Sequence, residues 1–136
     1  MHSLKRITRF VYTTLLFLTA VSFLTASDYI HSVDPEDYPA SEWEHGDRDA
    51  DGETDYVALQ NSQGRMIQEA YDVNYDGLLD DFYFYDEGEL IRRELDTVHD
   101  GQIDMWVYLV QGHLIEEIRR DTTGDGEADF VRKYSE

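Results

Sequence analysis

Cysteine is absent from the 136-residue chain, and this absence removes several kinds of chemistry. Without thiols the protein forms no disulfide, holds no thiolate metal site and uses no cysteine nucleophile. A small domain that lacks disulfides needs another source of cohesion, and a bound metal ion is one such source.

Basic residues are scarce, with 11 Lys and Arg against 30 Asp and Glu. Lys5, Arg6 and Arg9 precede all the acids, so from residue 28 onward eight basic residues face 30 acidic ones, a formal charge of −22. This excess repels phosphate backbones, and we expect no nucleic-acid partner. The acids are not scattered, because most of them gather in four short clusters.

Long hydrophobic runs are also missing. The longest, residues 10–24, has 15 residues, whereas a helix that crosses a membrane needs about 20. Basic residues precede this run and the small residues Thr25, Ala26 and Ser27 follow it, which is typical of a secretory signal peptide. We predict a signal helix over residues 1–27 and export to the periplasm or the medium, with membrane contact only if the segment stays uncleaved.

Four acidic segments recur every 24 or 25 residues. We name them loops one to four: DRDADGETD (47–55), DVNYDGLLD (72–80), DTVHDGQID (96–104) and DTTGDGEAD (121–129). Between successive loops lie two extended pieces rich in aromatic and β-branched residues, divided by turns at Gly64, Gly88 and Gly112. The chain is therefore predicted to be an array of β-hairpins.

The predicted fold is all-β, an antiparallel meander of about seven strands over residues 47–136. The acidic loops should lie along one edge and the tight turns along the other. Residues 28–46, which hold both prolines, are interpreted as a linker or an N-terminal cap, with Trp43 covering the first strand. Apolar residues at the second and fourth places after the loops predict one face of the sheet: Val57, Leu59, Phe82, Phe84, Trp106, Tyr108 and Val131. Lys133 breaks this pattern in the last repeat, as expected where a terminal unit meets water.

The loops place oxygen-bearing side chains at their first, third, fifth and ninth positions and glycine at the sixth. Ca²⁺ takes six to eight oxygen ligands, and alternate side chains of a short loop can converge on one ion. The candidate side-chain ligands are Asp47, Asp49, Asp51, Asp55, Asp72, Asn74, Asp76, Asp80, Asp96, Asp100, Asp104, Asp121, Thr123, Asp125 and Asp129. The third place of loop three is the apolar Val98. Ligand charge ranks loop one first, then loops two, four and three, with Mg²⁺ a weaker candidate than Ca²⁺.

This pattern resembles the loop of the EF-hand family. The resemblance implies that the seventh residues, Glu53, Leu78, Gln102 and Glu127, supply backbone carbonyls. It ends after nine residues, because the twelfth place lacks the family's bidentate Glu and no flanking helices are predicted. The loops are also similar to those of thrombospondin type 3 repeats and integrin-type β-propellers, which implies that the ninth Asp closes each site. The whole unit resembles repeats of exported bacterial proteins.

These observations favour a non-enzymatic, exported protein in which Ca²⁺ rigidifies a β-sheet. One alternative is that the loops are metal-free turns, although a turn alone should need Asp and Gly at only one or two places. A second is a module that binds a protein or glycan through its aromatic and arginine residues, including Arg92-Arg93 and Arg119-Arg120, which we interpret as equivalent pairs in consecutive repeats. A third is a hydrolase with paired carboxylates, which would need a deep cleft that a short meander does not favour.

Overall fold

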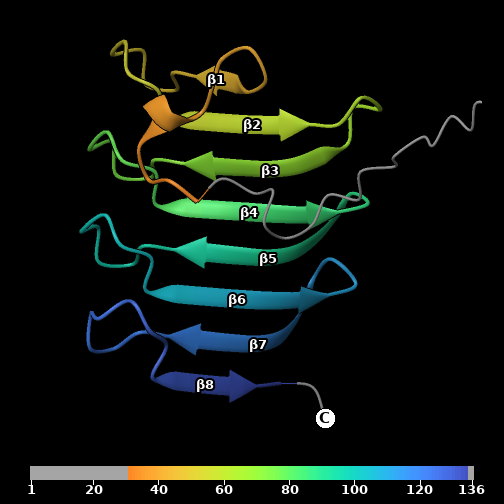
Figure 1. Ribbon diagram of the computed structural model, residues 1–136, viewed down its shortest axis with the longest axis vertical. Helices are drawn as coiled ribbons and strands as arrows, with labels where there is room; N and C mark the ends of the chain where they lie inside the picture. The colour runs from red at the N-terminus through yellow and green to blue at the C-terminus, as the bar shows by residue number, and fades with distance from the viewer. Residues whose placement is uncertain (1–30, 135–136) are drawn as a thin grey trace, which may run out of the picture.

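The computed structural model describes residues 31–134, which form one antiparallel sheet with strands in chain order (Figure 1). A short 3₁₀ helix, η2 (Pro35–Asp37), precedes the sheet. The strands are β1 (Glu44–Gly46), β2 (Tyr56–Gln60), β3 (Met66–Tyr71), β4 (Asp81–Asp86), β5 (Glu89–Leu95), β6 (Met105–Val110), β7 (Leu114–Arg120) and β8 (Phe130–Lys133). The predicted signal helix lies outside the described residues. In the described part of the chain no helix is long and apolar enough to cross a membrane.

The meander prediction is confirmed, with one addition. Seven strands lie within residues 47–136 as expected, and an eighth, β1, comes from the segment interpreted as a linker or cap. Its three residues pair with β2, His45 opposite Val57. The sequence pattern missed β1 because it is short and does not belong to a repeat.

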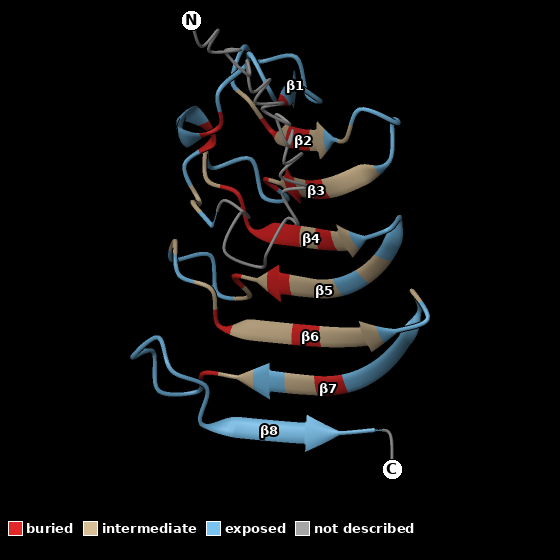
Figure 2. Ribbon diagram, turned by 45° about the vertical axis from the view of Figure 1, so that its right-hand side comes forward, coloured by how far each residue is buried: buried red, intermediate tan, exposed pale blue. Residues whose placement is uncertain are grey.

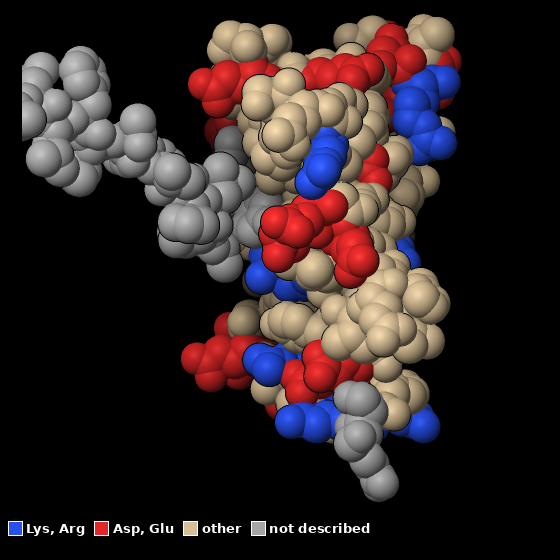
Figure 3. Space-filling model, turned by 90° about the vertical axis from the view of Figure 1, so that its right-hand side faces the viewer, with Lys and Arg blue, Asp and Glu red and all other residues tan. Residues whose placement is uncertain are grey.

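The connections alternate between two edges of the sheet. Figure 1 shows the four acidic loops along one edge and the tight turns along the other. The turn between β4 and β5 has φ +48° at Glu87 and +87° at Gly88, and Gln111 and Gly112 are also left-handed before β7. Positive φ at two successive turn residues matches the right-handed twist of the paired strands. Acidic and basic side chains are interspersed over this turn edge (Figure 3).

The core lies on one side of the sheet, beneath residues 31–43, which we name the cap segment. Trp43 and Tyr38 from this segment pack edge to face, with ring centroids 4.7 Å apart. Val33 accepts a hydrogen bond from the Leu79 backbone N–H at 2.7 Å, and His31 stacks on Phe84 at 5.2 Å. The buried core cluster consists of Tyr38, Trp43, Val57, Ala70, Leu79, Phe82 and Phe84.

The predicted apolar face is this capped face, but its burial declines along the chain. Register places Val57, Phe82, Trp106 and Val131 on the same face. Val57 and Phe82 are fully buried, Trp106 is half-buried and Val131 is 52% exposed. The described contacts of the cap segment reach as far as β5, where His31 lies 3.1 Å from Glu94, and burial falls from there to β8, as the shift from red to blue in Figure 2 shows.

The opposite face, the open face, is rich in tyrosine. The Glu69 carboxylate accepts hydrogen bonds from three tyrosine hydroxyls, at 3.3 Å from Tyr56, 3.1 Å from Tyr71 and 2.5 Å from Tyr85. Such bonds satisfy a carboxylate that would otherwise be costly to cover with rings. Burial, followed by the hydrogen bond to Asp81, raises the pKa of Tyr83 to about 12.

The two arginine pairs are not equivalent, contrary to the sequence interpretation. Arg92 faces Phe84 across β4 and β5, whereas the matching place opposite Tyr108 is taken by Glu117. The pairs are offset by two residues, which keeps Arg92 and Arg119 on the capped face because a strand repeats its faces every second residue.

Candidate metal loops

The four acidic loops share one backbone conformation. The fourth residue of each is left-handed, with φ +66° at Ala50, +61° at Tyr75, +58° at His99 and +75° at Gly124. The glycine at the sixth place is left-handed as well. Four sequences that differ at the fourth place therefore close in the same way, and the loop is a repeated structural unit.

The first Asp of each loop organises this conformation. In loop two, Asp72 accepts from the Tyr75 N–H at 2.7 Å with one oxygen and from the Gly77 N–H at 2.8 Å with the other. The equivalent Asp47, Asp96 and Asp121 accept from the fourth and sixth N–H groups in the same way. These carboxylates satisfy loop donors that no strand partner reaches.

The fifth and ninth side chains of every loop, and the third side chains of loops one and two, also accept backbone N–H groups. The fifth Asp accepts from the seventh N–H, as Asp76 does from Leu78 at 3.0 Å. The ninth Asp accepts from the second N–H, as Asp80 does from Val73 at 2.9 Å. The third side chains of loops one and two accept from the fifth N–H, whereas the Thr123 hydroxyl of loop four donates to Asp121 at 3.2 Å.

These contacts correct one step of the sequence argument. A turn was expected to need oxygen at one or two places, but the turn of loop one uses it at all four. The spacing alone therefore does not separate a metal loop from a turn. What separates them is whether carboxylate oxygens also converge on a common centre, because each oxygen keeps a further lone pair.

Loop one meets that criterion. Asp47, Asp49 and Asp55 each offer an oxygen, and these three atoms lie within 4.8 Å of one another. Two oxygens bound to one Ca²⁺ at about 2.5 Å lie at most about 5 Å apart, so the donor set fits this ion. Desolvation and the charges of Asp51, Asp55 and Asp47 raise the pKa of Asp49, against the lowering effect of the Asp51 N–H. A cation at this place would relieve that repulsion.

Within residues 31–134, loops two to four bring no comparable group of three carboxylates together. In loop two, the Asn74 amide donates to Asp76 at 2.9 Å, and His99 from the next loop lies 2.9 Å from Asp80. That hydrogen bond, acting against desolvation, raises the pKa of His99.

Loops three and four hold their ninth Asp with a threonine at the second place. Thr97 donates its hydroxyl to Asp104 at 2.6 Å, and the Thr122 hydroxyl contacts both oxygens of Asp129, at 3.0 and 2.9 Å. Desolvation tends to raise the pKa of Asp121, but the N–H groups of Gly126, Gly124 and Thr123 outweigh it and lower that pKa. The threonine shared by the second place of these two loops was a readable signal in the sequence that the ligand pattern did not include.

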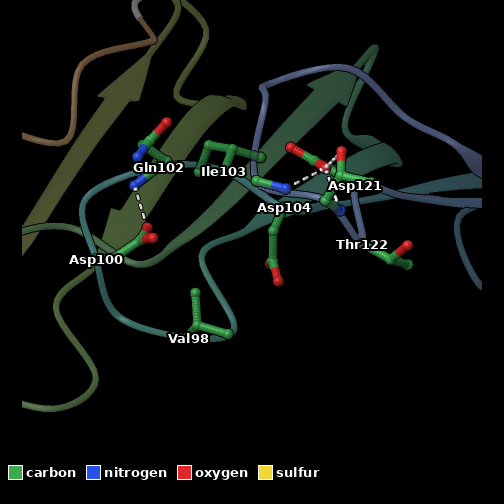
Figure 4. A pocket seen from close by; sticks show the side chains of 9 residues that line it. Val98, Asp100, Gln102, Ile103, Asp104, Asp121 and Thr122 are labelled. Carbon is green, nitrogen blue, oxygen red and sulfur yellow. Dashed lines mark hydrogen bonds between the residues drawn. The ribbon is translucent and has the colours of Figure 1, made fainter.

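A hollow of about 260 Å³ separates loops three and four. Figure 4 shows Val98 and Asp100 on the side of loop three and Asp121 and Thr122 on the side of loop four, with Asp100 and Asp121 well apart. Val98 at the third place is 62% exposed and carries no ligand oxygen.

Adjacent loops are joined through their first and ninth residues. The Asp72 N–H donates to the Asp55 carbonyl at 2.9 Å, and the same bond links Asp96 to Asp80 and Asp121 to Asp104. The seventh residue of one loop also reaches the glycine of the next: Glu53 lies against Gly77 and Leu78 against Gly101. Candidate ligands of successive loops are thus part of one hydrogen-bonded edge.

Comparisons with known proteins give a fold and no family. No family model matches the chain, and no curated protein matches it. One similar solved structure is a chain in the crystal structure of accessory secretory proteins 1, 2 and 3 of Streptococcus pneumoniae, with a TM-score of 0.53 and 12% sequence identity. The match covers 79% of this chain and 21% of that chain, and it shows a shared fold alone.

Proposed function

We propose that the protein is an exported, non-enzymatic module in which Ca²⁺ bound by the acidic loops rigidifies the sheet. The observation that carries this proposal is the convergence of Asp47, Asp49 and Asp55 in loop one. The basic start, 15-residue apolar run and small residues of the first 27 residues support a setting in export.

The physical role of the ion would be to offset carboxylate charge in the folded state. The three oxygens of loop one converge only when the loop is closed, so an ion that binds them binds the folded chain and stabilises it by mass action. At free Ca²⁺ tenfold above the dissociation constant, this linkage is worth about 1.4 kcal/mol per site. The affinity expected for such exposed loops is in the millimolar range of extracellular modules.

Calorimetric titration with CaCl₂ tests the proposal. We expect heat of binding in the native protein and about tenfold weaker binding at loop one after Asp49→Asn, because one charged ligand is lost. Asp86→Asn is the matched control, since it removes one exposed charge outside the loops and should leave binding unchanged. The same melting temperature in CaCl₂ and in EDTA would rule the proposal out.

A second function is favoured by one further observation. On the capped face a hollow of about 230 Å³ is lined by Trp106, Tyr108, Arg119, Gly126 and Ala128. The Arg119 guanidinium lies over the Tyr108 ring at 4.9 Å. An aromatic surface with a charged rim suits a protein or glycan partner. This function differs from the first in its metal dependence, because binding here would survive EDTA.

A further inference from the structure

In the described part of the chain no strand pairs with the outer side of β8, and the β8 side chains lie in solvent. All four of its residues are exposed, and Phe130 and Val131 are 46% and 52% exposed. β8 is the last strand of the sheet, and Figure 2 shows it exposed along its whole length. An exposed strand of this kind is a template for pairing with another strand.

The free edge offers the backbone groups of Val131 and Lys133. Tyr134 donates its N–H to the Glu116 carbonyl at 2.8 Å, so the backbone groups of this residue face β7. Alternate residues of a strand turn these groups to opposite sides. The N–H and C=O of Arg132 therefore also face β7, whereas those of Val131 and Lys133 point away from the sheet.

We propose that β8 pairs with β8 of a second copy around a two-fold axis at Val131, which joins two sheets into one. In this antiparallel register Val131 lies opposite Val131, Phe130 opposite Arg132, and Asp129 opposite Lys133. The neighbouring register is disfavoured, because an axis at Arg132 would place two guanidinium groups face to face. A two-fold contact of this kind closes at two copies.

Cross-strand pairs of an aromatic residue and an arginine, like those that this register creates, already occur within the sheet. β4 and β5 place Phe84 opposite Arg92 and Tyr83 opposite Arg93, and each guanidinium lies over its ring, at 4.2 and 4.6 Å. Two Phe130–Arg132 pairs across the axis would repeat this arrangement on the open face.

Charge along β8 also favours antiparallel self-pairing. The strand starts beside acidic loop four and ends in Arg132 and Lys133. Antiparallel pairing places the basic end of each copy next to the acidic start of the other. β1, the other edge, has only three residues and begins with Glu44, so it offers a shorter template.

Sedimentation velocity of the purified protein over a range of concentrations, at one fixed calcium concentration, tests the pairing. We expect a monomer–dimer equilibrium in the native protein. Val131→Pro removes an N–H that points away from β7, and an edge strand tolerates proline there. This change should raise the dimer dissociation constant about tenfold or more, whereas Val131→Thr, which keeps the N–H, should not.

Introduced cysteines test the register, and the native chain contributes no background because it contains no cysteine. In the double variant Phe130→Cys, Arg132→Cys, opposite residues form a non-hydrogen-bonded pair with Cα atoms about 4.5 Å apart, within disulfide range. We expect a covalent dimer on a non-reducing gel. Lys133→Cys alone should remain monomeric, since its two copies lie about 13 Å apart along the strands.

Three results would overturn the inference: a monomer at every concentration, a dimer that Val131→Pro leaves unchanged, or equal crosslinking through Lys133→Cys. A dimer that persists in EDTA would leave the inference intact even if calcium binding failed. The two proposals are therefore tested separately.

Discussion

At the residue scale, the left-handed backbone at the fourth position of each acidic loop costs conformational free energy. The size of that cost depends on which residue occupies the position. A left-handed conformation is unfavourable for residues with a Cβ atom by about 1 to 2 kcal/mol, and glycine avoids most of that cost. Loop four has Gly124 at this place, but loop one has Ala50 at φ +66°. The shared hydrogen bonds to the first Asp hold Ala50 in this conformation.

Because of this difference, exchanging alanine and glycine at the fourth place of loops one and four should change the free energy of unfolding in opposite directions. Ala50→Gly should stabilise the protein by about 0.5 to 1 kcal/mol, because the relief of the left-handed Cβ exceeds the added entropy of the unfolded chain. Gly124→Ala should destabilise it by a similar amount. Urea denaturation at equilibrium measures both changes, and two changes of the same sign would contradict the assignment of equivalent backbones.

At the element scale, the sequence predicted the strands of the hairpins well and the cap poorly. Strands β2 to β7 lie between the acidic loops and the glycine turns, where the sequence placed the extended pieces. Their positions follow from a period of two and from glycine turns, and both are local signals. The cap segment is held by contacts such as Tyr38 on Trp43, which have no period, so only the placement of Trp43 over the first strand could be expected.

The two tryptophans provide a matched test of the cap. Both belong to the apolar side of the sheet, but Trp43 is 5% exposed in the core and Trp106 is half-buried beyond the cap. Trp43→Ala should cost about 3 to 5 kcal/mol, enough to unfold much of a marginally stable domain. Trp106→Ala should cost about 1 kcal/mol, since it leaves no enclosed cavity. Denaturant unfolding followed by circular dichroism compares them, and equal losses would contradict the importance of the cap.

At the whole-molecule scale, stability should decrease along the sheet. Each hairpin depends on its neighbours for burial, and the buried core cluster reaches only as far as β4. For the acidic loops the sequence predicted ligand oxygens and ranked loop one first, but it could not predict which loops bring these oxygens together, because spacing fixes which side chains point inward and not how far they are from one another. The hydroxyl of Thr97 and the ring of His99 change that outcome through contacts with Asp104 and Asp80.

Hydrogen exchange would reveal this gradient. At concentrations where the protein is monomeric, we expect the slowest amide exchange in β3 and β4 and the fastest among the strands in β8, with β7 between them. The reason is that β8 has one strand neighbour and no cap above it. Uniform protection from β2 to β8 would contradict an unequal distribution of stability.

The bonds between successive loops also fix the spacing of charge along the edge. Equivalent carboxylates of adjacent loops are separated by two strands, or roughly 9.5 Å, which is close to the Debye length at 0.1 M salt, about 10 Å. The charge of an ion held by one loop would thus act on the next loop in dilute buffer and be largely screened from it in concentrated salt. If the acidic loops bind Ca²⁺ as proposed, ions at neighbouring loops should therefore influence each other's binding at low ionic strength and bind independently at high ionic strength.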